Sequence, residues 1–80
     1  MPRYFFDVQD GDLTVDDEGK TLSEPNAVAA EAMRTLLEIG QFEVLRKNER
    51  ELTVTVRNEA GKEVYRTELT IRAGWLPPTG

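Results

Sequence analysis

Oxygen-bearing side chains recur at alternate positions in one acidic segment near the N-terminus, and this spacing could bind a cation. The series is Asp10, Asp12, Thr14, Asp16 and Glu18. Calcium-binding loops place their oxygen ligands at alternate positions in this way. Such loops also need a glycine at a sharp turn and a final bidentate glutamate, and Val15 and Thr21 stand at those positions. The pattern therefore favours a solvated acidic turn, with Asp10, Asp12, Asp16 and Glu18 left as weak metal-ligand candidates.

Residues that usually carry out catalysis near neutral pH are scarce. The chain has no histidine and no cysteine, and its one serine is Ser23. Histidine is the usual general base near neutral pH, and Ser23 stands where a helix N-cap is expected. We therefore expect no catalytic residue, no cofactor and no enzymatic activity. The alternative is a small metal-binding protein or an enzyme that uses the acidic turn Asp10–Glu18.

Trp75 and Leu76 follow the last predicted strand and are the candidate interaction residues. Tryptophan is enriched at interface hot spots, and sheet edges readily pair with another chain. By elimination, the sequence favours a non-catalytic protein-interaction or regulatory module, with a second copy or a basic protein as partner. Continued alternation predicts Trp75 at least half buried, either on its own core or across a dimer interface.

The charge distribution argues against nucleic acid as a partner. The net charge is −5, and residues 1–20 hold six acidic and only two basic residues. This acidic segment would repel a phosphate backbone. The arginines of the predicted polar sheet face are interrupted by glutamates, and only Phe5 could supply the exposed aromatic ring that RNA-binding sheets use for stacking.

The length of the chain fits one small domain. Eighty residues support little more than one helix on one sheet. The lack of cysteine fits a reducing compartment, and no apolar run is long enough to cross a bilayer. We therefore expect a single α+β domain over residues 1–80 with a C-terminal tail over 74–80, cytoplasmic and without a membrane partner.

Two hairpins are predicted from alternating segments. Residues 3–9 and 12–16 alternate on either side of Asp10-Gly11, a pair that favours a two-residue turn. That turn would set Val8 opposite Leu13 and Phe6 opposite Val15. Residues 51–57 alternate as well, with a four-residue turn over 58–61. This second turn would set Val54 opposite Tyr65, with a bulge at Val64.

One helix is predicted over residues 24–46, between the two hairpins. Ser23 is the expected N-cap, and Pro25 is tolerated in the first turn. Gly40 could end or bend the helix because glycine is a poor helix former. The apolar stripe is Ala29, Ala32, Met33, Leu36, Ile39, Gly40 and Val44. The fold is therefore expected to be β-β-α-β-β, a four-stranded antiparallel sheet of two hairpins with the helix on one face and the other face polar.

Three short motifs resemble those of a family of short uncharacterised bacterial proteins. They are the opening Met1-Pro2-Arg3-Tyr4-Phe5-Phe6, the Asp10-Gly11 turn, and Asp16-x-Glu18-Gly19. Glu59-Ala60-Gly61 matches a late turn of the same family. The resemblance implies the fold but no activity and no site residues, because the family is a domain of unknown function. A weaker similarity is to HicB-type antitoxins, which also open with two strands around an acidic glycine turn.

Overall fold

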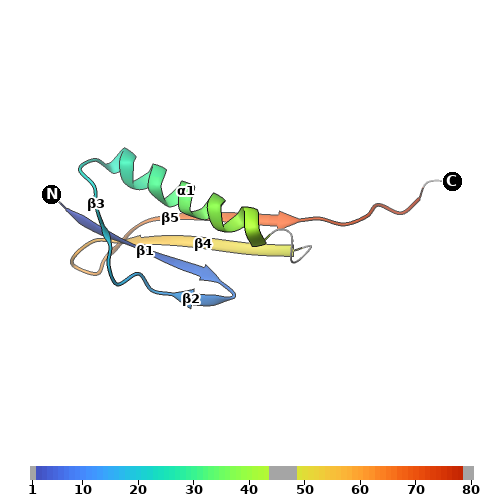
Figure 1. Ribbon diagram of the computed structural model, residues 1–80, viewed down its shortest axis with the longest axis horizontal. Coiled ribbons are helices and arrows are strands. Elements are labelled where there is room, and N and C mark those ends of the chain that lie inside the picture. The colour runs from blue at the N-terminus through green and yellow to red at the C-terminus, as the bar shows by residue number, and fades with distance from the viewer. Residues whose placement is uncertain (1, 44–48, 79–80) are drawn as a thin grey trace.

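A computed structural model describes residues 2–43 and 49–78 as one helix on one antiparallel sheet (Figure 1). The order along the sheet is β2-β1-β4-β5, and β3 also pairs with β1. The elements are β1 (Arg3–Asp10), β2 (Asp12–Thr14), β3 (Lys20–Thr21), α1 (Pro25–Glu43), β4 (Glu49–Arg57) and β5 (Glu63–Arg72). The predicted α+β fold is confirmed, with the short β3 as an addition.

The core lies between α1 and the middle of the sheet. Alternation along β4 turns Leu52, Val54 and Val56 toward the helix, and each is at most 1% exposed. The helix contributes Val28, Ala32 and Leu36 to the same cluster. The opposite face of the sheet carries polar side chains and is open to solvent, as a one-sided antiparallel sheet allows. We call it the open face.

The second hairpin keeps the predicted faces but has a different register. Val56 pairs with Tyr65, so the predicted pair Val54–Tyr65 is wrong by two residues. A two-residue shift leaves every side chain on its face. The turn is wider than predicted because the Asn58 Oδ1 accepts the Ala60 and Lys62 N–H groups, both at 3.0 Å. The register shifts between Val56 and Arg57, which confirms the bulge predicted at Val64.

The first hairpin differs by one residue, and this changes which side chains are buried. Val8 pairs with Thr14 and Gln9 with Leu13, so the predicted pairs Val8–Leu13 and Phe6–Val15 are wrong. A one-residue shift turns the whole second strand over. Leu13 and Val15 are accordingly 59% and 57% exposed.

The helix begins at Pro25 and continues through Gly40 to Glu43, while predicted residues 44–46 lie outside the described residues. Its first helical bond joins the Val28 N–H to the Glu24 carbonyl at 3.2 Å, which places the N-cap at Glu24 and not at Ser23. Gly40 allows a close approach to β5, because a Cβ there would lie 2.8 Å from the Leu69 Cδ2. Leu36 is buried as predicted, but Met33 is 47% exposed, so the buried stripe runs through Val28 instead.

Candidate functional site

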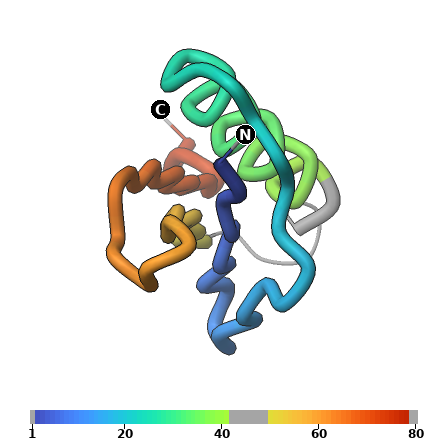
Figure 2. Tube along the Cα trace, turned by 90° about the vertical axis from the view of Figure 1, so that its left-hand side faces the viewer, coloured from blue at the N-terminus to red at the C-terminus, as the bar shows by residue number. Residues whose placement is uncertain are grey.

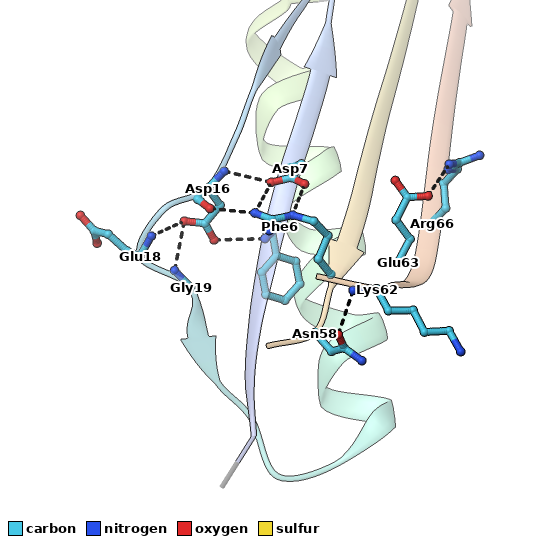
Figure 3. A network of polar contacts seen from close by, with 10 residues as sticks. Phe6, Asp7, Asp16, Glu18, Gly19, Asn58, Lys62, Glu63 and Arg66 are labelled. Atoms are coloured by element: carbon cyan, nitrogen blue, oxygen red, sulfur yellow. Dashed lines mark hydrogen bonds and ion pairs between the residues drawn. The ribbon is translucent and has the colours of Figure 1, made fainter. Parts of the chain in front are cut away.

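The acidic segment is organised around the carboxylate of Asp16. Its Oδ1 accepts the N–H groups of Glu18 and Gly19, and its Oδ2 accepts the N–H of Phe6 on β1, all at 3.1 Å (Figure 3). Burial alone would raise the pKa of Asp16, but these three N–H donors outweigh it and hold the pKa below its ordinary value. Asp16 therefore fastens the acidic turn to the sheet.

Gly19 completes this turn, and any side chain there would be strained. Its φ is +73°, and a Cβ would lie 2.9 Å from both the Phe5 ring and the Tyr4 carbonyl oxygen. The motif Asp16-x-Glu18-Gly19 is thus a structural clasp between the turn and β1.

Asp7 and Arg57 form an ion pair on the open face beside this clasp. The Arg57 Nε and Nη2 lie 2.6 and 3.1 Å from the two Asp7 carboxylate oxygens, a bidentate geometry. Burial alone would raise the pKa of Asp7. The hydrogen bonds from Arg57 and from the Asp16 N–H have a larger effect in the opposite direction and hold this pKa below its ordinary value. The guanidinium also lies 5.1 Å from the centre of the Phe5 ring. Phe5, the one aromatic candidate for base stacking, is therefore half-buried under an arginine.

The four metal-ligand candidates do not converge. Asp16 is occupied by backbone N–H groups, Asp10 forms an ion pair with Arg50, and Asp12 and Glu18 are exposed. Within residues 2–43 and 49–78, no three acidic side chains are grouped closely enough to hold a metal ion.

Among the same described residues, no helix combines the length and apolar character needed to cross a bilayer.

A shallow polar groove of about 370 Å³ lies on the open face. Its lining is Asp7, Gln9, Leu13, Thr53, Thr55, Glu63, Arg66 and Glu68. Arg66 lies 3.3 Å from Glu63, and Asp7 is bound by Arg57, so these three charged side chains of the groove have partners within the chain. The groove offers threonine hydroxyls and carboxylates but no strong nucleophile or neutral-pH base.

The outer edge of β5 is the longest exposed sheet edge in the described part of the chain. β5 pairs with β4 on one side, and its other side has no neighbouring strand among residues 2–43 and 49–78. The opposite edge of the sheet is divided between β2, with three residues, and β3, with two. Long exposed edges present unpaired N–H and C=O groups to another strand.

The tail that carries the predicted interaction residues continues the line of β5 away from the body (Figure 1). Trp75 is 102% exposed and Leu76 is 89% exposed. The prediction that Trp75 caps its own core is wrong, because β4 begins at Glu49 opposite Arg72, so the tail extends past the β4 register. Burial of Trp75 between two chains stays a prediction.

The exposed apolar side chains of α1 lie on the flank nearest β5. Gly40 touches Leu69 of β5, whereas Glu31 on the other flank binds Lys20 of β3 at 2.8 Å. Because a helix turns by about 100° per residue, Met33 and Leu37 fall on the same flank as Gly40. Their exposed fractions are 47% and 60%.

A small apolar hollow lies at the start of β5, beside the first turn of α1. Figure 2 shows α1 lying along one side of the strands. Its volume is about 270 Å³, and its lining is Tyr4, Pro25, Val28, Asn58, Val64 and Tyr65. We call the exposed apolar residues along this side the β5 edge patch: Met33, Leu37, Val64, Trp75 and Leu76.

Sequence reasoning found the tail residues of this patch but missed its helical part. Helical spacing predicts Met33 in the core, but Met33 lies at the boundary of the helical stripe, where the period alone does not decide whether a side chain is buried. β5 is an edge strand because β1 pairs directly with β4, although the whole of α1 separates these two strands in the sequence. No local residue pattern specifies that pairing.

No curated protein and no solved structure matches the chain. The family model described as "Domain of unknown function (DUF6894)" matches residues 3–70. The match spans the clasp, the helix and most of β5, and it ends before the tail with Trp75. The resemblance to an uncharacterised family of short proteins is thereby confirmed. The chain belongs to the DUF6894 family.

Proposed function

We propose that the chain is a non-catalytic protein-interaction module that binds its partner along the outer edge of β5. The observation that supports this most directly is that most of the exposed apolar side chains lie along this side of the molecule, from Val64 at the start of β5 to the tail beyond its end. Of the seven large apolar side chains exposed within the described residues, five form the β5 edge patch. Grouped exposed apolar residues beside a free strand edge are typical of a partner-binding surface.

The acidic turn is less suited to be the binding surface. Asp7, Asp10 and Asp16 already have arginine or backbone partners within the chain. A metal ion or a basic protein would have to compete with those contacts. The β5 edge needs no such exchange.

A pair of matched substitutions tests the proposal. Leu37 in the patch and Leu13 on the open face are 60% and 59% exposed, so Leu37→Glu and Leu13→Glu add the same charge at equally exposed sites. A photo-reactive residue at position 64 should cross-link the partner, and Leu37→Glu should abolish that cross-link while Leu13→Glu keeps it. Equal cross-linking by the two variants, or a partner that cross-links from position 13 instead, would overturn the proposal.

A further inference from the structure

We infer that the partner at this edge is a second copy of the chain, with the two β5 strands paired antiparallel about a two-fold axis at Thr70. The inference rests on the proposed function, because it names the occupant of the same edge. A two-fold axis perpendicular to the sheet makes one continuous sheet and keeps both helices on one side of it. The interface then uses the same residues from each copy.

Charge complementarity and the position of the tail together select the register. With Thr70 opposite Thr70 of the partner subunit, Arg72 lies opposite the partner subunit's Glu68, and symmetry repeats this pair. Centring the axis on Leu69 would set Arg72 against Arg66, and centring it on Glu68 would set two glutamates together. Centring it on Thr67 would also pair opposite charges, Arg66 with Glu68, but it would place Trp75 beyond the start of the partner subunit's β5. Opposite charges that face each other across two strands stabilise the pairing, and like charges destabilise it. All three of these charged side chains are exposed.

The same register places the tail over the hollow at the start of β5. Trp75 lies opposite Tyr65 of the partner subunit, because both are five residues from Thr70. The tail leaves the C-terminal end of β5 (Figure 1), whereas the hollow is lined by residues at the start of β5, so antiparallel pairing would bring them together. At about 270 Å³, the hollow is below the usual range of roughly 300–1,000 Å³ for small-molecule sites. A single inserted side chain suits it better.

The exposed flank of α1 also gains a contact. Gly40, near the end of α1, lies beside Leu69 and close to the axis, whereas the first turn of α1 lies at the start of β5. The axis therefore sets the two helices end to end, and the partner subunit's tail runs beside β5 below the flank that carries Met33 and Leu37. That tail would cover the two side chains.

The dimer should be weak. Two tryptophans bury about 300–500 Å² together, which is less than half of the roughly 1,200 Å² at the lower limit for stable complexes. We expect dissociation in the micromolar range or weaker.

Charge exchange between two variants provides the test. Glu68→Arg sets arginine against arginine in a homodimer, and Arg72→Glu sets glutamate against glutamate. Sedimentation velocity from about 1 μM to about 1 mM should show each variant self-associating at least roughly tenfold more weakly than wild type. An equimolar mixture restores both opposite-charge pairs, and it should form a heterodimer with near wild-type affinity. Glu38→Arg, an exposed helix residue outside the patch, is the matched control and should dimerise normally.

A second measurement follows the tail. Trp75 emission should shift to the blue as wild-type protein is concentrated, and Trp75→Ala should weaken dimerisation by roughly tenfold or more. A mixture that associates no better than either variant alone, or a wild-type chain that stays monomeric at about 1 mM, would overturn the inference. If the chain is monomeric but Leu37→Glu still abolishes cross-linking to another protein, the second copy is wrong while the proposed function stands. If the chain is monomeric and Leu37→Glu leaves cross-linking unchanged, both the second copy and the proposed function are wrong.

Discussion

Replacing Asp16 with alanine removes the acceptor that fastens the acidic turn to β1. Three backbone N–H groups lose their partner, two of them partly buried and one exposed. Hydrogen bonds to a charged group contribute about 1.5–3 kcal/mol each, and water replaces the exposed one cheaply. We therefore expect Asp16→Ala to lower the free energy of unfolding by about 2–4 kcal/mol. At about 0.05–0.15 kcal/mol per residue, an 80-residue domain has a total of only about 4–12 kcal/mol.

The assay is urea unfolding followed by circular dichroism, because an exposed Trp75 does not report on the core. Asp17→Ala is the control: it removes the same charge from the next residue, which is exposed. Folding lowers the pKa of Asp16. The ionised carboxylate therefore makes its full contribution to the free energy of unfolding above the unfolded pKa of 3.8, and this contribution is lost as pH falls through the lower pKa of the folded state. The difference between wild type and Asp16→Asn should therefore shrink below about pH 4. Equal effects of Asp16→Ala and Asp17→Ala would refute this account of the turn.

Further predictions concern the packing, the turns and the metal site. Gly19→Ala should destabilise the fold by about 2–4 kcal/mol because of the positive φ at this position and the close contacts with β1. Gly11 has a φ of +75° but no atom within 4 Å of an added Cβ, so Gly11→Ala should cost only about 1 kcal/mol. Equal melting temperatures for the two variants would contradict this. Leu36→Ala should cost about 2–4 kcal/mol, while Leu37→Ala in dilute monomer should change stability by less than about 0.5 kcal/mol, as measured by chemical denaturation; a large loss from Leu37→Ala would mean that the helix faces are assigned wrongly. Adding calcium should leave the melting temperature and the amide NMR shifts of residues 10–18 unchanged, and saturable shifts there at micromolar metal would revive the metal-binding alternative.

The sequence predicts the fold class because the local patterns agree with the final packing. Strict alternation in Leu52, Val54 and Val56 gives a buried strand face, and that face is buried as expected. The first hairpin fails because Asp10-Gly11 is compatible with more than one turn geometry. The contact that accompanies the observed geometry joins the Asp16 carboxylate to the Phe6 N–H, ten residues away. A tertiary hydrogen bond of this kind leaves no periodic signal.

The tail shows a different limit of pattern reasoning. Alternation along β5 was extended to Trp75, but alternation implies burial only where a neighbouring strand and a helix continue beside it. The register of β4 ends at Glu49, opposite Arg72. The residue type of Trp75 nevertheless predicts an interaction residue. The exposed strand edge beside it follows only from the strand order of the sheet.

Amide hydrogen exchange along β5, measured on dilute and concentrated protein, tests the central claim most directly. In an edge strand, the N–H groups of alternate residues point away from the sheet and exchange readily with water. If β5 is the binding edge, those alternate amides between Glu63 and Arg72 should become protected on association, while the amides of β2 stay unchanged. Protection that appears on β2 or the open face while β5 exchanges at an unaltered rate would contradict the claim.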